Sequence, residues 1–179
     1  MNIAVYCSAK DTIADCYKQL GTEFALWISR NGHTLVYGGA TGGLMTVVSK
    51  TCIDNGGEVI GVVPERIIRS GRRSQWCTQL IEVGNMSERK QRMRETADCF
   101  VCLPGSYGTL DEMFDVIAAG TVGEHHKPIF IVNYHNFYAP LKQQIELMKQ
   151  ELFIPKDEIY KPCFVDSVEQ LIGNLETLL

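Results

Sequence analysis

Residues 103–112 have the residue types and the spacing that fit chemistry on a phosphorylated molecule. They read Leu-Pro-Gly-Ser-Tyr-Gly-Thr-Leu-Asp-Glu, directly after an apolar run at 99–103 that predicts a buried strand. Apolar residues at helical spacing follow, so a helix is expected from Thr109. A turn between a strand and a helix presents free backbone N–H groups and the positive end of the helix dipole. The segment therefore predicts a phosphate-binding turn with two carboxylates, Asp111 and Glu112, beside it.

A second glycine-rich turn, Gly-Gly-Ala-Thr-Gly-Gly, occupies residues 38–43. It matches the dinucleotide pattern G-x-G-x-x-G only loosely, and the nearest acid about 20 positions on, Glu58, opens a strand instead of ending one. No Gly-Lys-Ser/Thr follows, which excludes a P-loop. Two interpretations stay open: a ligand-binding turn, or a tight turn that uses glycine for its positive φ angles.

A basic pair, Arg89 and Lys90, lies near the start of a predicted helix. Positive charge at a helix start opposes the helix dipole, so helix stability does not explain the pair. An anionic ligand would explain it. A solvated basic face, continued by Arg92 and Arg94, is the alternative.

The elements that must position these residues alternate along the chain. Apolar runs predict strands at 3–7, 34–37, 58–63, 80–83, 99–103 and 129–133. Helical spacing predicts helices at about 13–30, 44–55, 86–97, 137–152 and 168–178, and one from Thr109. An arginine-rich segment at 65–78 has weak periodicity and is expected to be a partly mobile loop. The alternation predicts an α/β fold with a mostly parallel sheet covered by helices on both faces.

Ligands of such sheets bind at the carboxyl ends of the strands, near the point where the strand order reverses. Both glycine turns follow predicted strands, so we expect them to share one crevice. The order of the strands does not follow from the sequence.

Composition limits the class of protein. A chain of 179 residues, 45% hydrophobic and 21% charged, fits one globular domain. Its net charge of −4 does not favour nucleic acid as a partner. No apolar run approaches the roughly 20 residues that span a bilayer, and the start lacks a signal-peptide pattern. We therefore expect a cytoplasmic protein with no membrane partner.

Seven cysteines are scattered along the chain, and two of them, Cys99 and Cys102, have C-x-x-C spacing. In a strand, residues three apart point to opposite faces, so the two thiols are not expected to share a metal or a disulfide. We expect buried thiols and no metal site.

The sequence resembles the "lonely guy" family of cytokinin riboside 5′-monophosphate phosphoribohydrolases, formerly labelled possible lysine decarboxylases. The resemblance rests on Arg89-Lys90, on Pro-Gly-x-x-Gly-Thr-x-x-Glu at 104–112 and on the glycine run at 37–45, and it extends over nearly the whole chain. It implies a single Rossmann-like nucleotide-binding domain at 1–179, a three-layer sandwich and a homodimer. It also implies hydrolysis of the N-glycosidic bond of AMP or a cytokinin ribotide to free base and ribose 5-phosphate, without metal or cofactor.

The resemblance also implies residue roles. Arg89 and Glu112 match the catalytic pair. The residues that match substrate and phosphate contacts are Lys90, Gly105, Ser106, Tyr107, Gly108, Thr109, Asp111, Gly39 and Gly43. The pair suits the chemistry, because a carboxylate stabilises an oxocarbenium-like sugar and activates water, and a guanidinium clamps a phosphate or sugar oxygen.

Two other functions are possible for such a sequence. A non-catalytic carrier of a nucleotide or molybdenum cofactor, or a scaffold with a vestigial site, would need the same fold. Lysine decarboxylation would need a Schiff-base lysine for pyridoxal phosphate. The nearest candidate, Lys127, follows His125 and His126 in an expected surface turn at the beginning of a strand, where ligands do not bind.

Overall fold

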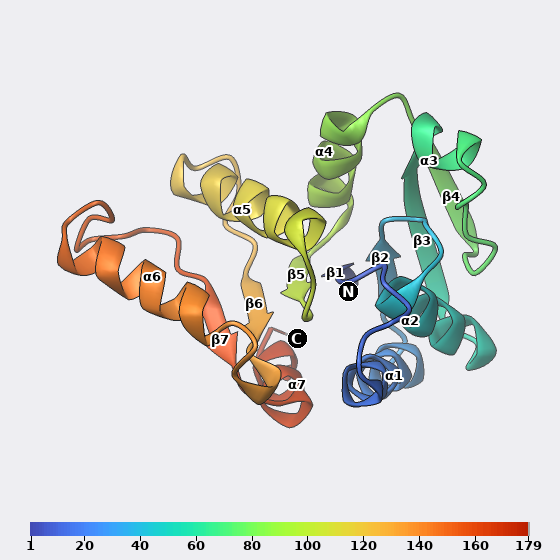
Figure 1. The fold of residues 1–179 in the computed structure, drawn as a ribbon, viewed down its shortest axis with the longest axis horizontal. Coiled ribbons are helices and arrows are strands. Elements are labelled where there is room, and N and C mark those ends of the chain that lie inside the picture. The colour runs from blue at the N-terminus through green and yellow to red at the C-terminus, as the bar shows by residue number, and fades with distance from the viewer. Residues whose placement is uncertain (179) are drawn as a thin grey trace.

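The computed structural model describes residues 1–178 and shows one parallel sheet between two layers of helices (Figure 1). In this part of the chain, seven strands are ordered β4-β3-β2-β1-β5-β6-β7, with every neighbouring pair parallel. The strands are β1 Asn2–Tyr6, β2 Thr34–Tyr37, β3 Glu58–Pro64, β4 Gln79–Val83, β5 Cys99–Cys102, β6 Ile129–Val132 and β7 Cys163–Val165. The expected three-layer α/β fold is confirmed.

Two helical layers cover the sheet. The helices are α1 Asp15–Arg30, α2 Gly43–Asp54, α3 Glu65–Arg69, α4 Met86–Thr96, α5 Tyr107–Thr121, α6 Ala139–Gln150 and α7 Val168–Glu176, with a 3-10 turn, η1, at Tyr134–Asn136. Helices α1, α2 and α7 lie on one face, and α4 and α5 lie on the other, as Figure 1 shows.

The inner strands β1, β2, β5 and β6 are buried on both faces, which explains their continuous apolar runs. Along β1, Ile3 and Val5 join the core under α1 and α2, whereas Ala4 and Tyr6 join the core under α4 and α5. Cys99 and Cys102 likewise lie in different cores, as predicted from their spacing.

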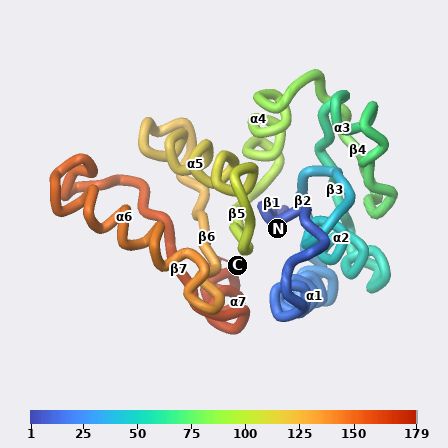
Figure 2. The backbone as a smooth tube through the Cα atoms, in the orientation of Figure 1, coloured from blue at the N-terminus to red at the C-terminus, as the bar shows by residue number. Residues whose placement is uncertain are grey.

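The order of the strands creates a switch point beside β1. The chain moves outward from β1 through β2 and β3 to β4, then returns to β5 on the other side of β1, and Figure 2 traces this path. The loops after β1 and β5 meet at the carboxyl edge, where the Ser8 N–H donates to the Pro104 carbonyl at 3.3 Å. The Met45 N–H, at the start of α2, donates to the Ser8 carbonyl at 3.3 Å. Three chain segments therefore converge where a ligand is expected.

The structure differs from the sequence-based expectation in three elements. The expected loop at 65–78 contains the short helix α3, and its later part is bonded to the first glycine turn. Helix α6 begins at Ala139 instead of residue 137, because Tyr138 has a non-helical backbone conformation with φ of −100° and ψ of 13°. Strand β7 was not predicted, because three residues are too few for a periodic pattern.

Within residues 1–178, every helix lacks the length or the apolar character that crossing a membrane requires.

Candidate active site

Arg89 and Glu112 form a buried ion pair at the carboxyl edge of the sheet. Nη2 of Arg89 lies 2.7 Å from Oε1 of Glu112, and the two side chains are 7% and 3% exposed. Arg89 comes from the first turns of α4 and Glu112 from the second turn of α5. Nε of Arg89 also donates to the Val62 carbonyl of β3 at 3.3 Å, which orients the guanidinium toward α5.

Gly38, at the end of β2, provides the space that Arg89 occupies. A Cβ atom on this glycine would lie 1.9 Å from Nη2 of Arg89 and 2.9 Å from its Cζ. No pair of heavy atoms without a bond approaches so closely, so any larger residue at position 38 displaces the guanidinium.

Asn85 and Glu88 together cap the start of α4. Oδ1 of Asn85 accepts a hydrogen bond from the Glu88 N–H at 3.0 Å, and the Glu88 carboxylate accepts one from the Gly84 N–H at 2.8 Å. The acidic cap offsets the unfavourable position of Arg89 and Lys90 near the helix start. Arg89 is therefore not needed for helix stability, and the exposed-face interpretation fails for it because its side chain is buried.

Opposing effects act on the Glu112 carboxyl. Burial raises its pKa, and the positive charge of Arg89 lowers it, with the net shift upward. Although Arg89 contacts Oε1, that oxygen receives no well-aligned hydrogen bond from any described residue. It therefore keeps acceptor capacity for a sugar hydroxyl or a water molecule.

The predicted phosphate turn leads directly into α5. Ser106 is the residue before the helix, and its side chain makes no capping hydrogen bond, so the first N–H groups of α5 have no side-chain partner there. A Cβ atom on Gly105 would lie 2.1 Å from Oγ1 of Thr109, so only glycine permits this close turn. This arrangement leaves an anion-binding position at the start of α5.

The turn is held by the segment that follows the neighbouring strand β6. The Tyr138 hydroxyl donates to the Leu103 carbonyl at 2.9 Å, and the Tyr138 N–H donates to Oδ1 of Asn133 at 2.8 Å. Nδ2 of Asn133 donates to Asp166 at 3.1 Å. These bonds fix the backbone just before the turn.

Lys90 and Asp111, two further predicted contacts, pair with each other. Nζ of Lys90 lies 2.8 Å from Oδ1 of Asp111 and 3.5 Å from Oδ1 of Asp115. The hydrogen bond to Asp111 raises the pKa of Lys90. The pair lies between α4 and α5, and Asp111 remains exposed.

The first glycine turn is packed against neighbouring backbone. Gly43 has a φ of 48°, and a Cβ there would lie 2.6 Å from the Lys10 nitrogen. Gly39 has a φ of 62°, and a Cβ there would lie 2.9 Å from Cβ of Val63. The Gly43 N–H donates to Oδ1 of Asp11 at 2.8 Å, so a carboxylate of the chain already occupies the start of α2. These contacts favour the tight-turn interpretation for this segment.

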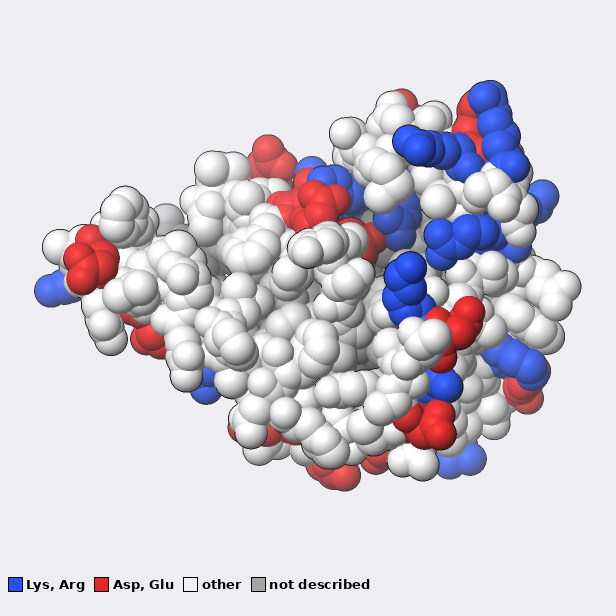
Figure 3. All heavy atoms as spheres, in the orientation of Figure 1, with Lys and Arg blue, Asp and Glu red and all other residues white. Residues whose placement is uncertain are grey.

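The two glycine turns border one cavity of about 720 Å³, which confirms the expected shared crevice. Its lining is polar and includes Lys10, Asp11, Thr41, Gly42, Thr46, Arg72 and Ser106. Figure 3 looks onto this edge and shows the surface hollowed near its centre, with Lys and Arg atoms gathered along the side that carries α3.

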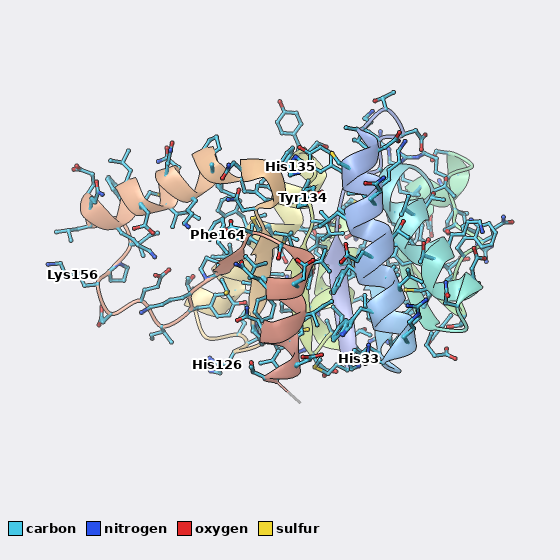
Figure 4. The ribbon with its side chains drawn as sticks, turned by 90° about the horizontal axis from the view of Figure 1, so that it is seen from below. His33, His126, Tyr134, His135, Lys156 and Phe164 are labelled. Carbon is cyan, nitrogen blue, oxygen red and sulfur yellow. The ribbon has the colours of Figure 1, made fainter. Side chains whose placement is uncertain are left out.

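Lys127 lies away from this edge, and its ammonium group is hydrogen-bonded to backbone carbonyls. Its Nζ donates to the carbonyls of Arg94 and Glu95 at 2.7 and 3.3 Å, which caps the end of α4. His126 is exposed as expected, at the opposite edge of the sheet from Tyr134 (Figure 4). His125, beside it, is half-buried, and its ring packs between Phe100 and Tyr160.

Residues 1–178 contain no group of three or more His, Cys, Asp or Glu side chains placed to hold a metal ion.

Three features of the site were not predicted from the sequence. They are the space that Gly38 leaves for Arg89, the support that Tyr138 gives to the turn before α5, and the position of Arg72 at the cavity. The glycine run at 37–45 was the available signal for Gly38. Tyr138 and Arg72 act through contacts with segments distant in sequence, so local patterns could not reveal them.

The fold and the site define a class of protein: a Rossmann-like α/β protein with a buried Arg–Glu pair beside a glycine turn at its switch point. The model of a family described as "Possible lysine decarboxylase" matches residues 45–175. A cytokinin riboside 5′-monophosphate phosphoribohydrolase of Arabidopsis thaliana is 32% identical over 174 residues, which cover 97% of this chain and 76% of the relative. One of Oryza sativa subsp. japonica is 36% identical over 174 residues, covering 97% and 72%. The chain belongs to this family of phosphoribohydrolases, as the resemblance predicted.

A molybdenum cofactor carrier protein of Chlamydomonas reinhardtii has a similar structure, with a TM-score of 0.74 at 19% identity over 99% of this chain and 96% of that one. At this identity the likeness shows the fold alone. The carrier alternative therefore has no support beyond a shared architecture.

Proposed function

We propose that this protein hydrolyses the N-glycosidic bond of a nucleoside 5′-monophosphate, AMP or a cytokinin ribotide, to free base and ribose 5-phosphate. The observation that carries the proposal is the buried ion pair of Arg89 and Glu112 beside the free start of α5. The relatives named as phosphoribohydrolases support the same reaction.

Glu112 is the proposed catalytic carboxylate. Cleavage of the bond to the base leaves positive charge on the sugar, and a buried carboxylate stabilises that charge strongly because water does not screen it. The free acceptor capacity of Oε1 suits a role in activating the attacking water.

Arg89 has two roles in this proposal. Its charge opposes the effect of burial on the pKa of Glu112, so it helps keep the carboxylate ionised. Its remaining N–H groups are donors for a sugar or phosphate oxygen.

The 5′-phosphate is proposed to bind at the start of α5. Backbone N–H groups at Gly105, Ser106, Tyr107, Gly108 and Thr109 would hold it, with Lys90 and Asp111 as contacts at the rim. Phosphate binding then holds C1′ of the sugar against Glu112, so remote binding energy lowers the barrier. For Gly39 and Gly43, the close backbone contacts favour shaping of the cavity over direct phosphate binding.

The test is a product assay for free base and ribose 5-phosphate from AMP and from a cytokinin ribotide. Wild-type protein releases both products. Glu112→Gln loses at least about 100-fold in kcat, since it removes the charge that the transition state needs, and still binds ribose 5-phosphate. Absence of base release by the wild type from every nucleotide in a broad panel contradicts the proposal.

We also propose a cytoplasmic homodimer of single-domain protomers, as the resemblance implies. A second copy would cover an apolar surface on α5 and the segment after α6, where Phe153 and Ile159 are 83% and 82% exposed beside a cavity of about 500 Å³. Light scattering should give the mass of a dimer, and Phe153→Glu should lower it. Leu147→Glu, on an exposed part of α6 outside that cavity, is the matched control.

A further inference from the structure

Two cationic side chains at the large cavity have no role in the mechanism above. Lys10 comes from the loop after β1, and Arg72 comes from the segment after α3. Ser106, which precedes α5, lines the same cavity. The proposed phosphate turn and two positive side chains therefore border one space of about 720 Å³.

Arg72 is placed at this cavity by its backbone. The Thr41 N–H donates to the Arg72 carbonyl at 2.9 Å, and Nη2 of Arg72 donates back to the Thr41 carbonyl at 3.3 Å. A β-bridge between Ala40 and Arg73 and a 2.9 Å bond from the Ser74 N–H to the Gly39 carbonyl extend this contact. The arginine-rich segment is therefore attached to the first glycine turn beside the cavity.

The charge of Arg72 is uncompensated, unlike that of its neighbours. Arg69 pairs with Glu65 at 2.7 Å, and Arg73 lies 3.8 Å from Glu82. Neither Arg72 nor Lys10 forms an ion pair with any of the residues that the structure describes. Two unpaired cations at one cavity favour an anionic ligand between them.

Asp11, the acidic residue at this cavity, is hydrogen-bonded to the start of α2. Oδ1 of Asp11 accepts the hydrogen bond from the Gly43 N–H, so its negative charge is partly offset by the start of α2. Lys10, Arg72 and the start of α5 therefore give the lining of this cavity a net positive character.

We propose that Lys10 and Arg72 are substrate-binding residues that complete the phosphate subsite at the start of α5. The identity of the ligand as a sugar 5-phosphate rests on the proposed function. Arginine suits two oxygens of a phosphate at once, and lysine adds a compact charge. Because a phosphate monoester is largely dianionic at pH 7, its oxygens could form ion pairs with Lys10 and Arg72 together.

The experiment measures ribose 5-phosphate binding by calorimetry and nucleotide hydrolysis for the same variants. Arg72→Ala and Lys10→Ala each weaken ribose 5-phosphate binding by roughly 10- to 100-fold, the effect of losing a hydrogen bond to a charged group. KM for AMP rises by a similar factor, whereas kcat falls much less. Arg72→Lys recovers part of the affinity, because it restores the charge without the second donor.

The matched control is Arg69→Ala, which removes an arginine three positions away that is already paired with Glu65. It leaves ribose 5-phosphate binding within about twofold of the wild type. Thermal unfolding temperatures of all variants stay close to that of the wild type, since the side chains are exposed.

Unchanged affinity of Arg72→Ala and Lys10→Ala for ribose 5-phosphate would overturn this inference. So would a wild type that binds neither ribose 5-phosphate nor inorganic phosphate. A wild type that binds ribose 5-phosphate through Arg72 but releases no base from any nucleotide refutes the proposed function and leaves the phosphate subsite standing.

Discussion

Glu112 is almost fully buried, and two influences act on its pKa in opposite directions. Burial raises the pKa, while Arg89 at 2.7 Å lowers it. At the residue scale, the proposed mechanism depends on this balance, because a neutral carboxyl would neither stabilise a sugar cation nor activate water.

We predict that kcat/KM falls on the acid side with an apparent pKa above the ordinary glutamate value of about 4.3. The direction of this shift follows from burial. The buried Glu112 carboxyl holds its proton more tightly than it would in water, so the active anion forms only at higher pH. Arg89→Gln removes the positive charge that lowers the pKa of Glu112, so the acid side of the kcat/KM profile moves to still higher pH. A pH profile of kcat/KM with AMP tests both statements, and a limb at or below the ordinary value would contradict them.

Gly38→Ala should reduce kcat/KM at least about tenfold, because its Cβ would lie 1.9 Å from the guanidinium of Arg89 and must displace it. Steady-state kinetics measure the loss. Gly173→Ala in α7, where a Cβ meets no atom within 4 Å, is the control and keeps full activity. Equal activity of the two variants would show that activity does not require Arg89 to occupy the space beside Gly38.

At the scale of elements, the site depends on two helix starts and on the loops that hold them. The cap formed by Asn85 and Glu88 stabilises the start of α4, and Tyr138 and Asn133 hold the strand end before α5. Because α5 carries both the turn and Glu112, a shift of its first turn would move the anion-binding position and the carboxylate together.

Tyr138→Phe should lower the free energy of unfolding by about 1 kcal/mol, because the Leu103 carbonyl loses a buried hydrogen bond. KM for the nucleotide should rise as well, since the turn is less well held. Urea unfolding and steady-state kinetics measure the two effects. Tyr107→Phe, whose ring is 90% exposed, is the control and leaves stability unchanged. Identical unfolding curves for the two variants would refute the support role of Tyr138.

The strand and helix alternation was readable from apolar periodicity, and most element boundaries fall within a few residues of those predicted. The exceptions have local causes. Strand β7 is too short to show a pattern, α3 has no buried residue to create periodicity, and the non-helical backbone of Tyr138 moves the start of α6 to Ala139.

At the scale of the whole molecule, His33 and His125 link stability to pH. Burial lowers the pKa of both side chains below the ordinary value near 6.5. The unfolded chain therefore binds protons at a higher pH than the folded protein does, so the stability due to neutral histidine is lost as pH falls below about 6.5.

We predict that the free energy of unfolding decreases between pH 7 and pH 5, and that His125→Gln makes this decrease smaller. Glutamine keeps a donor for the Val116 carbonyl, which Nε2 of His125 contacts at 2.9 Å. Urea unfolding at several pH values tests the prediction. His126→Gln, at an exposed position, is the control and keeps the wild-type slope. A slope that His125→Gln leaves unchanged would contradict the assignment to this residue.

The sequence by itself determined the α/β architecture, the glycine turn before α5 and the acid that follows it, because these depend on periodicity and on neighbours within one or two turns of chain. Only the tertiary structure decided the strand order, the contact of Arg89 with Glu112, and the place of Gly38 beneath the guanidinium. It also decided that Lys10 and Arg72 border the cavity beside the proposed phosphate turn. The physical reason is that these contacts join segments far apart in the chain, and they exist only once the parallel sheet has brought the ends of β1, β2, β3 and β5 to one edge.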